Sequence, residues 1–291
     1  MTTTTLITGA TGTIGNQVAR ELLKRGGLTV RVGTRQPEAA ADLQRIGAEV
    51  VRLDLDAADT LAEAFAGVDR VFLVGPQSSQ DFGERVGAVV AAAKQANIKF
   101  VLRLSALGAA VDSGFIMARQ HGVAEKHVAE SNIPWSILQP TFFQDNLLKF
   151  QGQAIAGQGA FYGASGEGKT AYVSSADIAR SAAAILLDPV KHAAKRYVLT
   201  GPEAISDAEL AKLVSDVIRK AVNYIDLPPE KLGASMREQG MPDWIVESML
   251  ALEAVKANGY AADVSAAVEQ ITGRAPETYR SFLERNRTRF V

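Results

Sequence analysis

The stretch Thr8-Gly9-Ala10-Thr11-Gly12-Thr13-Ile14-Gly15 decides the fold, because it sets a glycine at every third position between a β-prone run and a helical run. Residues 6–8 before it predict a strand. After it, Ile14, Val18 and Leu22 recur at helical spacing until Gly26-Gly27 ends the pattern. Strand, glycine turn and helix in this order are typical of a dinucleotide-binding unit, although the spacing is GxxGxxG rather than GxGxxG.

The glycines of this turn have a direct physical use. They permit a tight turn, let the backbone approach a pyrophosphate, and let the helix pack close to the strand, while the helix N-terminus offers N–H groups to the phosphate. The alternative is a glycine-rich turn that binds no ligand. The predicted cofactor-binding residues of the turn are Gly9, Thr11, Gly12, Thr13, Ile14 and Gly15.

Outward from the turn, β-prone runs alternate with helical stretches. We expect strands at residues 29–32, 49–53, 71–74, 100–104 and 136–138, and helices around residues 39–46, 58–66, 83–96 and 118–131. Alternation of this kind predicts an α/β fold with right-handed crossovers and a doubly wound parallel sheet, the Rossmann arrangement. Ligands of such sheets bind beyond the carboxyl ends of the strands.

The second half of the chain has a looser pattern. Residues 171–174 are expected to be extended, residues 176–187 to form a helix, and residues 196–200 to form a strand that returns to the same sheet. From residue 206 onward the pattern is mainly helical. We therefore expect an NAD(P)-binding Rossmann domain at residues 1–150 with a returning segment at 171–200, and a smaller, mainly helical substrate-binding lobe at 201–291.

Composition excludes several classes of function. The 291 residues carry 31 Lys and Arg against 32 Asp and Glu, for a net charge of -1, so no basic field indicates a nucleic-acid partner. The absence of cysteine removes disulfides, thiolate catalysis and Cys-based metal sites. His121, His127 and His192 lack the spacing of a helical metal site, and no metal is expected. Without a signal peptide or membrane span in the pattern, a cytoplasmic protein is expected.

The end of the second strand bears on the choice of cofactor. An acid near this point would hold the ribose 2′-hydroxyl of NAD, whereas this chain has Gly33-Thr34-Arg35 and no acid until Glu38. Arg35 suits bidentate contact with a phosphate, which favours NADP(H) over NAD(H). A solvated arginine at a strand end is the alternative. Asp54, after the third strand, is either a hydrogen-bond acceptor for the adenine amino group or a turn residue.

A second glycine-rich stretch, Gly163 to Thr170, fits the phosphate-binding pattern GxxxxGK[ST] letter for letter. That motif needs a helix beginning at its Lys-Thr. The residues that follow, 171–175, are β-prone instead. We therefore interpret this stretch as a polar loop and do not expect nucleotide hydrolysis.

These features together resemble the NmrA-like group of atypical short-chain dehydrogenases/reductases, which includes bacterial quinone oxidoreductases and triphenylmethane reductases. The resemblance covers nearly the whole chain. It depends on the glycine turn and on the following residues and segments: Thr34-Arg35, Asp54, 67–72, 121–126, 133–140, 177–179 and 197–204.

The resemblance implies a redox enzyme with an altered catalytic pair. Where ordinary members carry Tyr-x-x-x-Lys, this chain has His121 and Glu125, with Lys126 one step later. The loss of the pair argues against alcohol-dehydrogenase chemistry. It leaves hydride transfer from NADPH to a quinone-like or other conjugated small molecule, which needs little acid catalysis.

The remaining site predictions are as follows. His121 and Ser105 are candidate catalytic residues, although His121 is equally well explained as a capped or solvated helix residue. The further cofactor contacts are Gly75, Pro76, Lys126, Pro140 and Phe142, and the residues expected to contact the substrate are Phe143, Tyr162 and Trp244. For each aromatic residue among them, simple core packing is the alternative.

A second function of a different class also fits the resemblance: a non-catalytic NADP-binding regulator that reports redox state to a protein partner. Fold alone does not separate the two. The aromatic and apolar residues of the second lobe favour an enzyme with a substrate cavity. Neither function needs a nucleic-acid or membrane partner, and a homodimer stays open.

Overall fold

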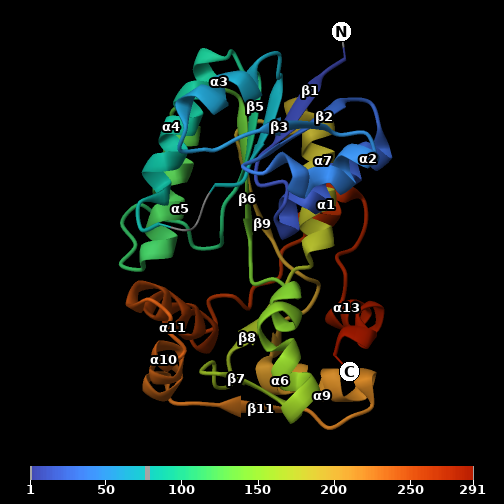
Figure 1. Cartoon of the computed structure of the whole chain (residues 1–291). Coiled ribbons are helices and arrows are strands. Elements are labelled where there is room, and N and C mark those ends of the chain that lie inside the picture. Colours follow the sequence, from blue (N-terminus) through green and yellow to red (C-terminus); the bar gives the residue numbers. More distant parts are fainter. Residues whose placement is uncertain (1, 76–78, 291) are drawn as a thin grey trace. The chain divides into compact units, whose positions relative to one another are not determined.

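The computed structural model describes residues 2–75 and 79–290. Its largest sheet has seven strands, and the glycine turn connects the first of them to the first helix (Figure 1). The strand order is β3-β2-β1-β4-β5-β6-β9, and the pairs from β3 to β6 are parallel. The order reverses at β1, as in a doubly wound sheet, so the predicted Rossmann fold is confirmed. The strands are β1 (Thr4–Ile7), β2 (Thr29–Thr34), β3 (Glu49–Arg52), β4 (Arg70–Leu73), β5 (Phe100–Leu104), β6 (Trp135–Pro140) and β9 (Lys195–Leu199).

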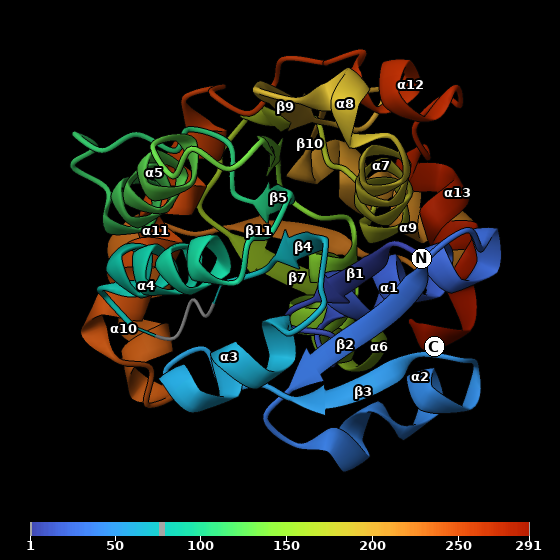
Figure 2. The ribbon, with the colours of Figure 1, turned by 90° about the horizontal axis from the view of Figure 1, so that it is seen from above.

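Helices cover both faces of this sheet. Figure 2 shows α3, α4 and α5 on one side, and α1 and α7 on the other. In α1, the buried residues Ile14, Val18 and Leu22 confirm the predicted stripe. The helices of this half are α1 (Thr13–Arg25), the 3-10 helix η1 (Pro37–Ala40), α2 (Ala41–Arg45), α3 (Ala58–Phe65), α4 (Phe82–Gln95), α5 (Ile116–Ala129), α7 (Ser175–Leu187) and α8 (Pro189–His192).

The core of the sheet lies at its central strands. Leu6, Val71 and Val101 are almost completely buried in one cluster with side chains of α3, α4 and α5. A fully buried Val or Leu contributes about 1.5–3 kcal/mol to folding, so this cluster fixes the helices on the sheet. Strand β5 is buried along its whole length, as expected for a central parallel strand, but it contains the charged Arg103.

The chain divides into two compact units by its internal contacts. The first consists of residues 1–140, 175–198 and 270–273, and the second of residues 141–174, 199–269 and 274–291. These boundaries differ from the expected ones, because residues 141–150 and 171–174 pack within the second unit. The Gln144 side chain shows the reason, since its Nε2 donates to the carbonyl oxygens of Tyr172 (3.2 Å) and Glu277 (3.1 Å).

The second unit is mainly helical and has its own core, in which Phe161, Val214 and Phe282 are buried. Helix α9 begins with a capping box, because Ser206 and Glu209 bond each other's backbone N–H groups. No helix in the described residues is long and apolar enough to cross a bilayer. The remaining elements are the π-helix η2 (Leu147–Gln151), α6 (Gly152–Gln158), β7 (Ala160–Gly163), β8 (Lys169–Thr170), β10 (Ile205–Ser206), α9 (Asp207–Ile218), β11 (Asn223–Asp226), α10 (Pro229–Glu238), α11 (Asp243–Ala257), α12 (Ala267–Thr272), α13 (Tyr279–Arg285) and the 3-10 helix η3 (Arg287–Arg289).

Two local expectations for this half need adjustment. Residues 171–174 form no regular strand beyond a single bridge between Phe143 and Val173. Strand β11, which pairs in parallel with β7, was not expected from the sequence. Its four residues carry no long apolar run, so only the partner strand reveals it.

Candidate cofactor-binding and active site

The turn between β1 and α1 has the geometry that a bound pyrophosphate requires. Gly9 has a φ of +61°, and its carbonyl oxygen accepts from the N–H of Gly12 at 3.0 Å. A Cβ on Gly15 would lie 2.3 Å from that same oxygen, so only glycine permits this close approach. Thr11, Gly12 and Thr13 are exposed, and no side chain caps the first turn of α1. The turn therefore leaves helix N–H groups available for an anion.

Thr8 joins this turn to the end of the neighbouring strand. Its buried hydroxyl accepts from the N–H of Val74 at 2.8 Å and donates to the carbonyl oxygen of Val74 at 2.9 Å. The carboxyl ends of β1 and β4 are thereby held together where the strand order reverses. This is the edge at which ligands bind in doubly wound sheets.

Arg35 and Asp54 lie at the same edge of the sheet. Arg35 directly follows β2 and is exposed. Asp54 is a turn residue, because its Oδ1 accepts from the N–H of Asp56 at 3.1 Å and its carbonyl oxygen accepts from the hydroxyl of Thr60 at 2.8 Å. The turn role of Asp54 is thus confirmed, while a contact with adenine stays a prediction.

His121 and Glu125 both lie on the buried face of α5, where their four-residue spacing places them. The His121 ring is 3% exposed and meets the Phe82 ring edge-on at 5.0 Å between centroids. Burial, and then the positive charge of Arg103, lower the pKa of His121 to about 3. The imidazole is therefore neutral at neutral pH and is a poor proton donor.

Glu125 is held by two partners and is not available as a catalytic base. Its Oε1 accepts from Nε2 of Gln139 at 2.8 Å, and its Oε2 accepts from Nε of Arg196 at 2.9 Å. The Arg196 guanidinium lies 4.9 Å from the centroid of the Trp135 ring. Lys126 is exposed, so it does not share the buried face of α5 with Glu125. Glu125, which stands where the resemblance implies the lysine of the Tyr-x-x-x-Lys pair, is thus a structural carboxylate.

Ser105 and Gly75 follow β5 and β4 at the carboxyl edge. The N–H of Ser105 donates to the carbonyl oxygen of Leu138 at 2.8 Å, and its buried Oγ has no hydrogen-bond partner in the described part of the chain. A Cβ on Gly75 would lie 2.8 Å from Cγ2 of Val86, which explains the glycine. Pro76, the other predicted contact here, lies outside the described residues.

The turn and this edge fit a bound dinucleotide, and comparison with known proteins agrees. Residues 9–189 match a protein family described as NAD(P)H-binding. The chain belongs to this family. It is 35% identical over 285 residues to an NAD(P)H azoreductase from Xenophilus azovorans, with 98% of each chain covered.

Two solved structures extend this likeness. The NADPH-dependent quinone oxidoreductase from Escherichia coli, complexed with NADPH, is 27% identical with a TM-score of 0.87 and covers 97% of this chain and 99% of its own. The Citrobacter triphenylmethane reductase is 25% identical with a TM-score of 0.85, covering 97% and 98%. The resemblance to the NmrA-like group is confirmed, and the family member described here is an NAD(P)H-dependent oxidoreductase.

In this family member, the predicted substrate residues all belong to the second unit. Phe143 forms the bridge to Val173. Its neighbour Phe142, a predicted cofactor contact, packs edge-on against Tyr172 with 6.3 Å between ring centroids. The Tyr162 hydroxyl donates to Oε1 of Gln158 at 2.9 Å, and Trp244 is half-buried on α11. Pro140 is the buried last residue of β6. These positions agree with packing roles, and their contact with a ligand stays a prediction.

The second glycine-rich stretch binds its own chain. The N–H of Ala164 donates to Oε2 of Glu253 at 2.9 Å, that of Ser165 to the Tyr224 hydroxyl at 3.0 Å, and that of Gly166 to Oδ1 of Asp226 at 2.9 Å. The Lys-Thr of the motif forms strand β8 rather than the start of a helix. The interpretation of this stretch as a loop that leads into extended residues, and not into a helix, is confirmed.

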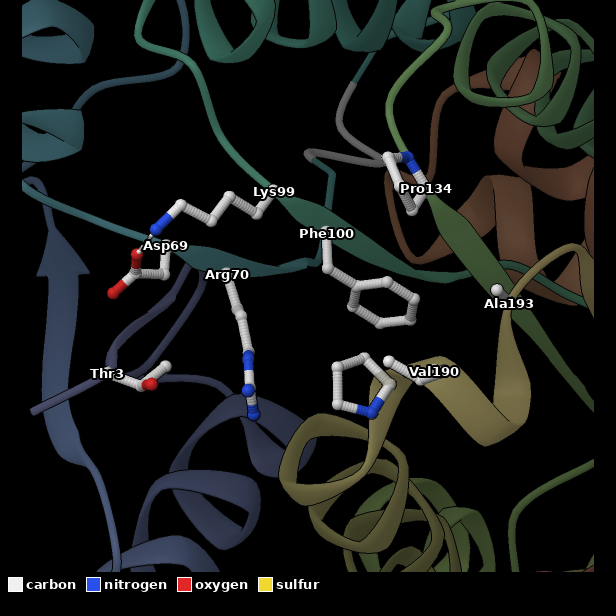
Figure 3. A pocket seen from close by; sticks show the side chains of 9 residues that line it. Thr3, Asp69, Arg70, Lys99, Phe100, Pro134, Val190 and Ala193 are labelled. Carbon is white, nitrogen blue, oxygen red and sulfur yellow. Dashed lines mark hydrogen bonds and ion pairs between the residues drawn. The ribbon is translucent and has the colours of Figure 1, made fainter.

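A pocket of about 410 Å³ lies at the opposite, amino edge of the sheet (Figure 3). Its charged groups are already engaged: Nζ of Lys99 lies 2.6 Å from Oδ1 of Asp69, and Nη1 of Arg70 donates to the carbonyl oxygen of Leu186. The edge is the wrong one for a dinucleotide. The pocket is lined by Thr3, Asp69, Arg70, Lys99, Phe100, Pro134, Pro189, Val190 and Ala193.

The sequence did not reveal the polar residues that surround His121 and Glu125. Gln139 and Arg196 carry no local signal, because their partner lies 14 and 71 residues away. Arg103 did carry one, since a charged residue within the buried run Phe100–Leu104 is unusual.

Proposed function

We propose that this oxidoreductase uses NADPH to transfer a hydride to a quinone-like or other conjugated small-molecule acceptor. The observation that carries the proposal is the state of the altered catalytic pair. His121 is buried and neutral, and Glu125 is bound to Gln139 and Arg196. A site without a strong acid suits an acceptor that takes a hydride readily and obtains any proton from solvent.

The residues of the chain then have the following roles. The turn from Gly9 to Gly15 binds the pyrophosphate through backbone N–H groups, and Arg35 binds the 2′-phosphate. A bound reduced nicotinamide supplies the hydride. The unpartnered Oγ of Ser105 orients an oxygen atom of the ligand. Phe143, Tyr162 and Trp244 are proposed to contact the acceptor, whose closeness to the cofactor does most of the catalytic work.

The relatives support this class of acceptor. Their names specify an azoreductase, an NADPH-dependent quinone oxidoreductase and a triphenylmethane reductase. Azo compounds, quinones and triphenylmethane dyes share extended conjugation and an electron-poor centre that accepts a hydride. Their shared chemistry, rather than any one compound, defines the proposed substrate class.

The test is anaerobic mixing of the pure protein and NADPH with a panel of quinones, azo dyes, triphenylmethane dyes and enals. Loss of the absorbance of reduced nicotinamide with at least one acceptor is the expected result. Tight NADPH binding without turnover of any acceptor would overturn the proposed reaction and favour the NADP-binding regulator.

Preference for NADP(H) rests on Arg35 and has its own test. Replacing Arg35 with Ala removes a charge-assisted contact to the 2′-phosphate, so the Kd for NADPH is expected to rise about tenfold or more while that for NADH stays unchanged. Arg45→Ala, at an exposed arginine of α2, is the matched control. Equal responses of the two cofactors to Arg35→Ala would disprove the 2′-phosphate role. Titration followed by nicotinamide fluorescence measures the Kd of each cofactor for the unsubstituted protein and for both variants.

A further inference from the structure

Arg103 is a charged side chain in the most deeply buried strand of the sheet. It is 1% exposed, and among the described residues it is the largest side chain that is fully buried. Burial lowers its pKa to about 10, with Glu125 acting in the opposite direction, so the guanidinium remains charged at neutral pH. Burying such a charge costs several kcal/mol unless hydrogen bonds and a counterion compensate it, which raises the question of what Arg103 binds.

The described residues satisfy only part of this guanidinium. Its Nη1 donates to the carbonyl oxygen of Leu73 at 3.1 Å, whereas Nε and Nη2 have no partner in the described part of the chain. Glu125, the acid that acts on it electrostatically, is hydrogen-bonded to Gln139 and Arg196 instead. Buried donors in folded proteins are nearly always paired, so two unpaired donors on one buried cation point to a partner that arrives from outside the chain.

The unpaired donors lie at the ligand-binding edge. Nη2 is 3.4 Å from the position that a Cβ on Gly75 would take, directly beneath the carboxyl end of β4. Ser105 directly follows β5, and its N–H continues the pairing with β6 by donating to the carbonyl oxygen of Leu138. Because it is two residues after Arg103, its side chain faces the same side of the sheet, about 6.6 Å further along. Its Oγ is also buried and unpartnered within the described residues. Three polar atoms without partners thus gather at the ends of β4 and β5.

The position within the sheet indicates which part of a dinucleotide would meet these atoms. A dinucleotide spans the point where strand order reverses, here between β1 and β4. With Arg35 at the end of β2, the adenosine half belongs over β2 and β1. The nicotinamide and its ribose then belong over β4 and β5, where Arg103 and Ser105 lie.

We propose that Arg103 is a positioning residue of the cofactor site: it fixes the carboxyl end of β4 through the carbonyl oxygen of Leu73, and its unpaired N–H groups bind oxygen of the nicotinamide-ribose half of NADPH. The inference rests on the proposed function for the identity of the cofactor.

The test is Arg103→Met, which keeps an unbranched apolar side chain and removes the guanidinium. The expected result has two parts. The ligand-free protein unfolds at the same temperature or higher, because an incompletely paired buried charge has gone. The Kd for NADPH rises about tenfold or more, whereas the Kd for 2′,5′-ADP, which lacks the nicotinamide half, stays within about twofold.

Val101→Ala is the control for a purely structural role, because Val101 is 1% exposed on the same strand. It is expected to lower the unfolding temperature without a selective effect on NADPH. If Arg103→Met behaved like this control, or weakened NADPH and 2′,5′-ADP equally, the proposal would be overturned.

Arg103→Lys keeps the test decisive if the methionine variant fails to fold. Lysine retains the charge, but its compact ammonium cannot reproduce the planar fork of five N–H donors that reaches Leu73 and the cofactor at the same time. The proposal requires weaker binding of NADPH with unchanged binding of 2′,5′-ADP, and normal NADPH binding would overturn it. None of these measurements depends on turnover, so failure of the proposed reaction with every acceptor is distinguishable from failure of this inference.

Discussion

The two glycine-rich segments of this protein have similar letters and opposite uses. The turn at residues 9–15 follows β1 and leads into α1, and its exposed residues leave the first N–H groups of the helix available. The loop at residues 163–170 follows β7 and leads into β8. Three of its successive N–H groups donate to Glu253, Tyr224 and Asp226. Two carboxylates and one phenol hydroxyl of the chain itself thus accept the hydrogen bonds that a phosphate would accept in a nucleotide-binding loop.

A buried ion pair between Lys256 and Asp207 stabilises the loop at residues 163–170. Nζ of Lys256 lies 2.6 Å from Oδ2 of Asp207, which also accepts from Oγ of Ser165 at 2.7 Å, and Oδ1 accepts from the Tyr172 hydroxyl at 2.6 Å. Burial acts to lower the pKa of Lys256, but Asp207 and Glu253 outweigh it and the pKa is raised. A carboxylate with this many donors is stable when buried.

Glycine spacing alone does not define a phosphate site in this protein. Each segment needs glycine for a local reason of packing: Gly15 lies against the backbone of Gly9, and Gly168 lies against the backbone of Lys256. What distinguishes them is the element that follows and whether the N–H groups are already used. A helix concentrates its unpaired N–H groups at its start, and a strand does not.

The largest expected effect separates the turn from the loop directly. In Gly15→Ala, the added Cβ would lie 2.3 Å from the carbonyl oxygen of Gly9, which forces α1 away from the turn. NADPH binding is expected to weaken about a hundredfold, equivalent to about 2.8 kcal/mol, as measured by calorimetric titration. Gly157→Ala, where nothing lies within 4 Å of the added Cβ, is the control. Unchanged affinity in Gly15→Ala would contradict the role of the turn.

Gly168→Ala should produce a large effect of a different kind. Its Cβ would lie 2.1 Å from the carbonyl oxygen of Lys256, and overpacking of this sort costs about 1–3 kcal/mol of stability. Urea unfolding measures the loss. The Kd of the folded variant for NADPH is expected to stay within about twofold of the value for the unsubstituted protein, because the N–H groups of the loop already donate to the chain itself. A hundredfold loss of affinity with intact stability would make the loop a nucleotide site and remove the contrast.

The smallest effect is expected for Glu253→Gln. An amide oxygen still accepts from the N–H of Ala164, and Lys256 keeps Asp207, so the loss of stability is expected to be about 1 kcal/mol. Urea unfolding measures this loss as well. Calorimetric titration with inorganic pyrophosphate should give the same stoichiometry and Kd for this variant as for the unsubstituted protein, in which the turn at residues 9–15 is the proposed site. An additional site in the variant would show that the carboxylate was masking a phosphate site in the loop.

The parallel sheet, the glycine turn and the buried face of α1 could be predicted from the sequence alone. These features follow from local periodicity and from glycines whose requirement is set by residues close in the chain, such as Gly15 against Gly9. The prediction that residues 163–170 are a loop and not a phosphate-binding motif also needed only local sequence, because the residues after Lys169 and Thr170 are β-prone.

The pairing of the polar side chains, by contrast, depends on the folded chain. Glu125 bonds Arg196 across 71 residues, and Ala164 bonds Glu253 across 89, distances over which no periodicity carries information. The same holds for β11, which depends on β7 for its hydrogen bonds, and for the neutral state of His121, which depends on burial beside Arg103. Long-range contacts are set by packing of the whole chain, so charge states and unpaired donors become visible only when the chain is folded.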